Sequence, residues 1–433
     1  MSERVLTFEQ ALAEVLAHAV SRRIGVESVA LLDAGGRVLG VDVAADRDQP
    51  AFNRSTRDGY AVRAGAIGAP LRVVGSVRAG ERWSGAALSE GEAIEIMTGA
   101  PLPAGADAVV MVEHVLVEGG LVRVEAGRAL RVGENVVARG AEVVAGSVVL
   151  PAGRVLGAAE IAVAASCGLA EVEVFVRPKV AIVATGDELV EFGEAMEAWQ
   201  IRNSNSYALA ALVSDEGGIG ERLAVARDTL EDLRERIAEG RAADLLLLSG
   251  GVSMGKYDLV EQVLREAGAE FFFTGALIQP GKPIVFGRLP KAKAPELSGR
   301  EQGPKGPSYA ESTATSSDDS GWTYFFGLPG NPVSTQVCFH LFVAPMLRAL
   351  GGRSEVAPRF AEARLAEAVK GGARVTRFLP AELTGGWDGV SVRVVGWQGS
   401  GDVAANARGN CYVVLPAGVE AFAVGETVRV LLR

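Results

Sequence analysis

Two short stretches, Ser249-Gly-Gly-Val-Ser-Met-Gly255 and Gly327-Leu-Pro-Gly-Asn-Pro-Val-Ser334, decide the fold of this chain. Each follows an apolar run, Leu245 to Leu248 in one case and Tyr324 to Phe326 in the other, and precedes a segment with helical spacing. They are therefore strand-to-helix turns, in which glycines let backbone N–H groups close around an anion at a helix N-terminus. One such turn is a weak signal. Two of them, with Gln279-Pro-Gly-Lys-Pro283 between, predict a site for a ligand that carries phosphate.

The chain around these turns alternates between strand-like and helical segments. Strands are predicted for apolar runs at residues 180–183, 245–248, 271–273 and 324–326. Helices are predicted near residues 206–216, 229–239, 258–267 and 333–350. Such alternation is typical of a parallel sheet with helices on both faces. The expected fold class is therefore multidomain α/β plus β, with this domain as its largest part.

Different patterns lie on either side of this domain. A capping-box sequence, Thr7-Phe-Glu-Gln10, begins a first helix. Residues 71–124 contain short alternating strands, with a hairpin expected at Gly119-Gly120, and form a small β domain. The Ala-rich stretch 155–169 returns the chain to a helical module. After Gly352, short strands recur and predict a small β-barrel or sandwich.

One segment differs in composition from everything around it. Residues 290–321 are rich in Pro, Ser, Gly, Lys and Glu, and Leu297 and Tyr309 are the large apolar residues in them. Such a segment buries too little apolar surface to order itself, so we expect a mobile insertion between two strands. An inert loop and a regulatory, partner-binding loop both fit this composition.

Composition excludes several classes of protein. A length of 433 residues exceeds one core, and a hydrophobic content of 48% supports packed domains. A net charge of −10 argues against a general nucleic-acid binder. Neither a signal peptide nor a membrane-spanning stretch is evident, so we expect a soluble, cytoplasmic protein without a membrane partner. The 3 Cys and 3 His residues are scattered along the sequence, so we expect neither a zinc site nor a disulfide framework.

Acidic side chains stand where a metal could bind. Asp187 and Glu188, in Thr185-Gly-Asp-Glu-Leu189, follow the first strand of the α/β domain, on the ligand side of such a sheet. Asp244 precedes the second strand and Asp258 follows the first glycine turn. Together these acids could hold Mg²⁺ through oxygen ligands. Asp187, Glu188 and Asp258 could equally cap the helices that follow them.

Basic and hydroxyl side chains stand where an oxyanion could bind. Lys282 lies between Pro280 and Pro283, which stiffen its backbone. Arg377 and Ser400 lie in the C-terminal β region, where a guanidinium fork and a hydroxyl suit an anion with several equivalent oxygens. From the sequence alone, Arg377 and Ser400 could also be ordinary surface residues.

Taken together, the motifs of this chain resemble the MoeA family of molybdenum insertases, which includes the gephyrin E domain. The resemblance covers essentially the whole chain in order. The motifs that carry it are Asp58-Gly-Tyr60, Met97-Thr-Gly-Ala100, Thr185-Gly-Asp-Glu188, Ser249-Gly-Gly-Val252, Pro280-Gly-Lys-Pro283, Gly327 to Ser334, Gln398-Gly-Ser400 and Gly409-Asn-Cys411.

The resemblance implies a domain organisation. Residues 1–45 and 146–177 would form an elongated, discontinuous helical module, with residues 46–145 inserted in it as a small β domain. Residues 178–352 would be a MogA-like three-layer α/β domain that binds molybdopterin and carries the 290–321 insertion, and residues 353–433 a C-terminal β-barrel. It also implies a homodimer in which the small β domain of one subunit reaches the α/β domain of the other.

The resemblance also implies a reaction and a set of residues. Molybdopterin adenylate and molybdate would react with Mg²⁺ or a similar ion to give molybdenum cofactor and AMP. Residues implied in catalysis are Asp58, Thr98, Glu188, Asp244 and Asp258, of which Glu188, Asp244 and Asp258 would hold the metal. Residues implied in binding substrates are Ser249, Gly250, Gly251, Ser253, Gly281, Lys282, Pro329, Gly330, Asn331, Ser334, Arg377 and Ser400. A MogA-like adenylyltransferase and molybdoenzyme apoproteins are the implied protein partners.

This chain departs from the family pattern in places. Gln279 stands where many members carry a second lysine, and Glu142 stands where Asp is usual; the 290–321 insertion is not part of the common pattern. Other interpretations are a MogA-type adenylyltransferase, a scaffold that keeps the fold without catalysis, and an insertase for tungstate.

Overall fold

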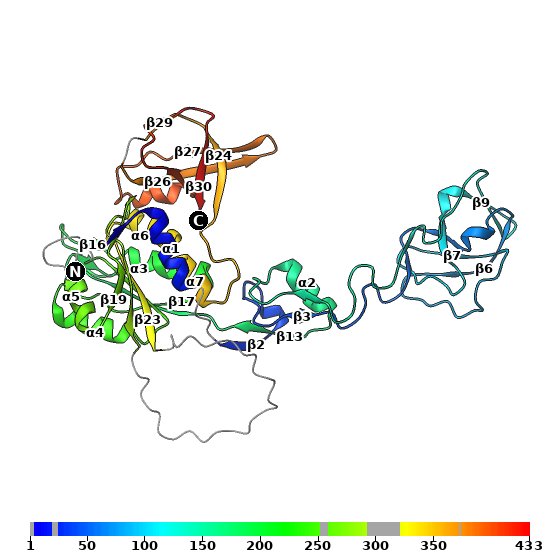
Figure 1. Cartoon of the computed structure of the whole chain (residues 1–433), viewed down its shortest axis with the longest axis horizontal. Coiled ribbons are helices and arrows are strands. Elements are labelled where there is room, and N and C mark those ends of the chain that lie inside the picture. Colours follow the sequence, from blue (N-terminus) through cyan, green and yellow to red (C-terminus); the bar gives the residue numbers. More distant parts are fainter. Residues whose placement is uncertain (1–3, 20–24, 252–258, 292–320, 372–373) are drawn as a thin grey trace, which may run out of the picture.

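The computed structural model describes residues 4–19, 25–251, 259–291, 321–371 and 374–433. The molecule is elongated (Figure 1). An α/β domain and a β-barrel lie together at one end, a small β domain lies at the other, and a slender module connects them. Ser253, Asp258 and most of the 290–321 insertion lie outside the described residues.

The α/β domain contains a six-stranded mixed sheet in the order β17-β14-β18-β23-β22-β19. The first four of these strands are parallel, as the sequence predicts. Strand β22 is antiparallel to both of its neighbours, β23 and β19, so it runs against the other five strands of the sheet. The four strands predicted from the sequence, which are β14, β18, β19 and β23, all run in one direction, and β22 was not predicted. Strands β22 and β23 lie on either side of the insertion in the sequence and pair with each other. Because they are antiparallel, their connection needs no crossover helix. The bounds are β14 Lys179–Ala184, β17 Ile219–Arg222, β18 Leu245–Ser249, β19 Glu270–Phe273, β22 Val285–Pro290 and β23 Trp322–Leu328.

Helices cover both faces of this sheet. Leu245 and Leu247 of β18 face one core with α3, α6 and α7, while Leu246 and Leu248 face a second core with α4 and α5. A strand that is buried on both faces has no solvent side, which explains its unbroken run of leucines. The bounds are α3 Asn205–Asp215, α4 Leu230–Gly240, α5 Leu259–Glu266, α6 Pro332–Cys338, a π-helical turn Phe339–Val343 and α7 Ala344–Leu350.

The first helix, α1 (Phe8–Ala19), also belongs to the α/β domain. Thr7 caps it, since the Thr7 hydroxyl accepts a hydrogen bond from Gln10 N at 3.2 Å. Strand β1 (Val5–Leu6) pairs with β20 (Gly275–Ala276), and the apolar face of α1 is buried in the core shared with α3 and α7. The expected division, which gave residues 1–45 to the elongated module, was therefore wrong for this segment. A capping box marks where a helix begins, but it does not identify the core that receives the helix.

One helical stretch, Pro332–Leu350, is long and apolar enough to span a membrane by length and composition. It is 94% buried inside the protein. It is the central helix of the α/β domain, and its apolar character follows from that burial.

The elongated module combines two separate parts of the chain. Strand β2 (Val26–Ala30) pairs with β13 (Glu171–Phe175), and β3 (Val43–Ala44) pairs with β12 (Val148–Leu150). Helix α2 (Ala158–Ser166) packs on them around a small core of its own. The module is discontinuous in sequence, as the resemblance implies.

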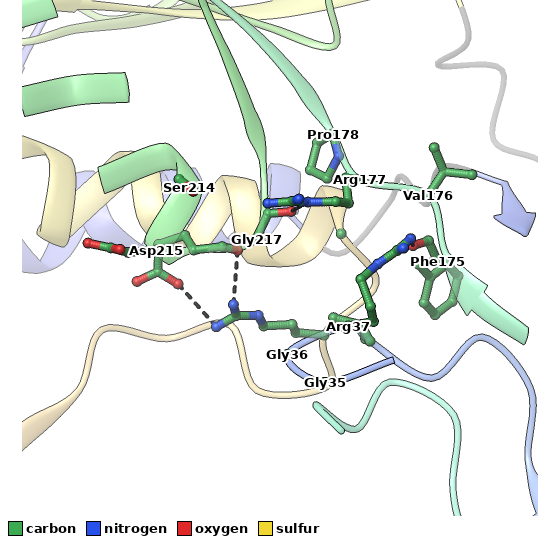
Figure 2. Close-up of a pocket in the computed structure, with 14 residues that line it drawn as sticks. Gly35, Gly36, Arg37, Phe175, Val176, Arg177, Pro178, Ser214, Asp215 and Gly217 are labelled. Carbon is green, nitrogen blue, oxygen red and sulfur yellow. Dashed lines mark hydrogen bonds and ion pairs between the residues drawn. The ribbon is translucent and has the colours of Figure 1, made fainter. Parts of the chain in front are cut away.

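A polar pocket of about 250 Å³ lies where the module meets the α/β domain. Figure 2 shows Arg37 of the module, Arg177 of the connecting chain and the end of α3 around this space. Arg177 donates to the carbonyls of Gly217 and Gly218, which follow α3. Arg353 donates to the carboxylate of Glu216 at 3.1 Å. The residues of this junction thus bind the C-terminal end of one helix.

The small β domain has a six-stranded sheet in the order β8-β5-β7-β6-β10-β9. The predicted hairpin is confirmed, since β9 and β10 pair around Gly119 and Gly120. The bounds are β5 Gly59–Val62, β6 Leu71–Val77, β7 Glu92–Ile96, β8 Ala108–Met111, β9 Val115–Glu118 and β10 Leu121–Val124, with β4 Arg54–Ser55 pairing with β11 Val136–Val137.

The C-terminal region is a closed five-stranded β-barrel, in which β26-β27-β24-β30-β28 returns to β26. The sequence predicted a small β-barrel or a sandwich for this region, and the barrel is confirmed. Strand β21 (Ile278–Gln279), which belongs to the α/β domain, pairs in parallel with the first two residues of β26. The bounds are β24 Phe360–Leu365, β26 Thr376–Gly386, β27 Gly389–Val394, β28 Cys411–Leu415 and β30 Thr427–Leu432, with α8 Val403–Arg408 and the pair β25 Val369–Lys370 and β29 Ala421–Phe422 beside them.

Candidate active site

A pocket of about 640 Å³ opens at the carboxyl ends of the parallel strands. From β14 the chain passes through α3 to β17 on one side, and from β17 through α4 to β18 on the other side. The pocket therefore lies where the strand order reverses, the place at which doubly wound sheets bind ligands. Its lining includes Glu188, Asn205, Asp228, Ser249, Gly250, Gly251, Pro329, Gly330, Asn331 and Gly401.

The two glycine turns contact one another at this pocket. Gly250 N donates to the carbonyl of Leu328 at 3.2 Å. Gly250 has φ +97°, and a Cβ on it would lie 2.5 Å from the carbonyl oxygen of Thr185. Only glycine combines this dihedral with so close an approach of backbone. This approach explains why a glycine follows Ser249 in the first turn.

Asn205, at the start of α3, connects these turns through its side chain. Its Nδ2 donates to the hydroxyl of Ser249 at 3.1 Å and to the carbonyl of Gly330 at 2.7 Å. The sequence analysis missed Asn205. Its signal was available, because an Asn before a helical pattern that follows a strand marks a helix start on the ligand side of the sheet.

Acidic groups gather beside the turns. The hydroxyl of Thr185 donates to Asp228 at 2.8 Å, and Asp228 N donates to Asp187 at 3.2 Å. Glu188 and Asp228 both line the pocket. Asp228 was not predicted as a site residue. It does not directly follow a predicted strand, and an aspartate just before a helix such as α4 is usually interpreted as a helix cap.

Asp244 does not lie with these acids, so the expected metal trio of Glu188, Asp244 and Asp258 is wrong for Asp244. Asp244 precedes β18, and β18 runs parallel to β14, so Asp244 lies at the amino edge of the sheet while Glu188 lies beyond its carboxyl edge. There the Asp244 carboxylate accepts from Lys179 N at 3.0 Å and pairs with Lys291 at 3.2 Å. Asp258 is outside the described residues, among which no group of three potential metal ligands is found.

The segments expected to bind an oxyanion adjoin one another around α6. The carbonyl of Ser400 accepts a hydrogen bond from Val333 N at 2.9 Å, next to Ser334. The carbonyl of Gly281 lies 3.5 Å from the Cys338 thiol, one helical turn after Ser334. Pro283 and Gly401, the neighbours of Lys282 and Ser400, line the pocket.

Arg377 lies opposite Gln279 in the pairing of β26 with β21. Its Nη1 donates to the carbonyl of Lys370 at 3.2 Å, while its buried Nε has no hydrogen-bond partner. An anion bound there could accept a hydrogen bond from this Nε, although the buried Nε atoms of Arg54, Arg128 and Arg241 are also without a partner. Gln279 brings a neutral amide to a place where a second lysine would add charge.

Asp58 and Thr98 form a pair in the small β domain. The Asp58 carboxylate accepts from Thr98 N at 2.7 Å and from the Thr98 hydroxyl at 2.8 Å. These two hydrogen bonds hold the pKa of the exposed Asp58 below its ordinary value of 3.8. Within one chain the pair lies at the opposite end of the molecule from the α/β domain (Figure 1). Nearby, Glu142 pairs with Arg54 at 2.7 Å.

Models of known protein families match most of this chain. The MoeA N-terminal region (domain I and II) matches residues 6–168, a probable molybdopterin binding domain matches 181–349, and the MoeA C-terminal region (domain IV) matches 362–432. A molybdopterin molybdenumtransferase of Staphylococcus aureus (strain MRSA252) is 32% identical over 416 residues, 94% of this chain and 90% of that protein. The protein of that name from Nostoc sp. is 34% identical over 416 residues, 94% of this chain and 88% of that protein.

Solved structures agree. A molybdopterin biosynthesis MoeA protein from Pyrococcus horikosii is 32% identical, covers 99% of both chains and has a TM-score of 0.72. Sequence and structure match along the chain in one order, from the first helix to the barrel, and the chain belongs to the MoeA family.

Proposed function

We propose that this protein is a molybdopterin molybdotransferase, which inserts molybdate into adenylylated molybdopterin and releases AMP. The relatives that it resembles over most of its length carry the name molybdopterin molybdenumtransferase. The observation that carries the proposal is the pocket at the switch point of the sheet, where two bonded glycine turns adjoin the segments of Lys282 and Ser400. Such turns bind phosphates through backbone N–H groups.

The reaction needs no protein nucleophile. Water cleaves the phosphoanhydride bond, and AMP leaves. The two dithiolene thiols of the substrate bond to molybdenum, and their protons leave with one molybdate oxygen as water. On this proposal Ser249, Gly250, Gly251, Gly330 and Asn331 hold the phosphates, and Asn205 fixes the two turns relative to each other. Lys282, Ser334, Arg377 and Ser400 bind molybdate at the edge of the pocket.

We also propose that Mg²⁺ takes part. Glu188 and Asp228 line the pocket, and Mg²⁺ commonly binds through one or two carboxylates together with substrate phosphates and water. The described residues thus fit a phosphate-bound ion better than a cage made by the protein alone. When bound, the ion would neutralise charge on the anhydride.

A homodimer is the assembly that we propose. The small β domain, which carries Asp58 and Thr98, lies at the end of the molecule opposite the α/β domain (Figure 1), so a second subunit would be needed to bring this pair to the pocket. We further propose a cytoplasmic location, a MogA-like adenylyltransferase as the source of the adenylate, and molybdoenzyme apoproteins as acceptors of the product.

The test is anaerobic incubation with molybdopterin adenylate, Mg²⁺ and molybdate, following AMP release and cofactor formation. We expect AMP release that depends on molybdate. Repetition with tungstate distinguishes a tungstate insertase, and consumption of ATP with free molybdopterin would identify a MogA-type adenylyltransferase instead. Binding without turnover would contradict the proposal in favour of a scaffold.

A further inference from the structure

The barrel contributes one segment to the active-site pocket, through Gly401 and Val403. It runs from Gln398 through Ser400 and Gly401 into α8, and we call residues 398–408 the barrel loop. The carboxylate of Asp402 accepts from Gln398 N at 3.0 Å and from Ala405 N at 2.9 Å, so it connects the start of the loop to the first turn of α8.

The barrel loop meets α6 at two places. Val333 N donates to the carbonyl of Ser400 at 2.9 Å. Farther along, Asn406 Nδ2 donates to Gln336 Oε1 at 2.9 Å. These contacts bring Ser400 next to Ser334, which are the two hydroxyl residues assigned to molybdate in the proposed function.

Arg433 determines how Asn406 is held. Its Nη2 donates to Asn406 Oδ1 at 2.7 Å, which leaves Nδ2 of that amide directed at Gln336. Its Nη1 donates to the carbonyls of Asn406 and Gly409, both at 3.0 Å, and so binds the end of α8. Hydrogen bonds from a charged donor are stronger than neutral ones, and a guanidinium fork constrains direction as well as distance.

Arg433 is itself fixed by a buried aromatic group. Its guanidinium lies over the ring of Tyr412, 4.5 Å from the centroid, and Tyr412 is fully buried. The Tyr412 ring lies 6.1 Å from that of His340, which stands in the π-helical turn after α6. The contacts thus form a closed path from α6 through the barrel and back: Gln336, Asn406, Arg433, Tyr412 and His340.

We propose that Arg433 is a positioning residue for the oxyanion end of the site, because it holds the barrel loop against α6 and so sets Ser400 beside Ser334. It contacts no substrate in this arrangement. The inference rests on the proposed function for its effect on molybdate, but the placement of the barrel loop can be measured without any substrate.

The experiment compares Arg433→Ala, Arg433→Lys and the wild type with a control, Arg429→Ala, which removes an exposed arginine from β30, the strand that directly precedes Arg433. Hydrogen exchange of peptides spanning residues 329–336 and 398–408 reports the contact with α6. Arg433→Ala should speed exchange in both peptides about tenfold, Arg433→Lys should fall between, and Arg429→Ala should match the wild type. Unchanged exchange in Arg433→Ala would overturn the proposal.

Kinetics supplies the second readout. Arg433→Ala should raise KM for molybdate about tenfold while KM for molybdopterin adenylate stays within about twofold of wild type. A general loss of structure would instead lower the melting temperature and change both constants together, which would contradict a positioning role. If the wild type shows no molybdate-dependent turnover, the proposed function fails, and the exchange data alone decide the role of Arg433.

Discussion

Lys282 is an exposed cation on a backbone held in place by buried neighbours. Its carbonyl accepts hydrogen bonds from Ala276 N and Ile284 N, at 3.0 and 2.9 Å. We predict that Lys282→Ala raises KM for molybdate about tenfold or more, because it removes a charge from an oxyanion site that already has Gln279 in place of a lysine. Affinity for AMP should stay nearly unchanged, as measured by calorimetry. Lys282→Arg should recover much of the loss, whereas equal losses for both ligands would contradict the assignment.

Gly250 is predicted to tolerate no side chain. Gly250→Ala would force a Cβ into the Thr185 carbonyl at a positive φ, so the turn must shift, at a cost of about 1–3 kcal/mol in unfolding free energy. Denaturant unfolding and AMP binding should both worsen. The matched control is Gly401→Ala, at the same pocket, where a Cβ meets nothing within 4 Å. Equal behaviour of the two variants would show that the turn is not constrained as described.

The pair of Asp58 and Thr98 gives a prediction on pH. Thr98→Val removes the hydroxyl donor but keeps the backbone donor, so the pKa of Asp58 should rise part of the way toward 3.8. Because the pKa is lowered in the folded state, its contribution to stability is present above about pH 4 and is lost as pH falls through the folded value. A carboxylate titration by NMR measures the shift. Thr98→Ser, which keeps the hydroxyl, should titrate like the wild type.

Among individual residues, the sequence predicts those whose role depends on local backbone geometry. Gly250 is such a residue, because it combines a positive φ with a close approach to the Thr185 carbonyl that only glycine allows. Asn205 and Asp228 were missed, because their roles depend on partners far along the chain, at Gly330 and Thr185. No local pattern records such pairings.

Among the elements, strand β18 separates Asp244, which precedes its amino end, from the pocket at its carboxyl end. Asp244 precedes β18 and pairs with Lys291, at the edge opposite the pocket. We predict that Asp244→Asn leaves the Mg²⁺ dependence of AMP release unchanged and lowers the unfolding free energy by about 1 kcal/mol, since a charged hydrogen bond is weakened. Asp228→Asn, at the pocket, should alter the Mg²⁺ dependence. A changed dependence in Asp244→Asn would return that residue to the site.

Four of the six strands in the α/β sheet follow from their apolar patterns, whereas β17 and β22 were not predicted. The partner of each strand or helix does not follow from its own pattern. The run from Leu245 to Leu248 predicts a strand that is buried on both faces, and the structure confirms this prediction. Nothing in residues 8–19 says that α1 packs against α7 rather than within the elongated module. Likewise, β22 was not predicted, and its antiparallel pairing with β23 is known from the structure alone.

For the whole molecule, the separation of Asp58 from the pocket leads to a test of the proposed dimer. We predict that the Asp58→Asn and Lys282→Ala homodimers both turn over poorly at a molybdate concentration well below the raised KM of Lys282→Ala. Mixing the two with exchange of subunits should restore activity at that concentration, because one pocket in each mixed dimer is then intact. About one quarter of wild-type turnover is expected if half the dimers are mixed. A mixture that stays inactive, in subunits shown by mass to have exchanged, would contradict a site shared between chains.

The junction pocket has a mechanical consequence. The small β domain is carried at the end of the slender module, and the module meets the α/β domain around Arg37, Arg177 and the end of α3 (Figures 1 and 2). Because the module is long, a small rotation at this junction would displace the small β domain by a much larger distance. A substitution at the junction is therefore expected to change where the Asp58 carboxylate reaches, although the small β domain lies at the other end of the module.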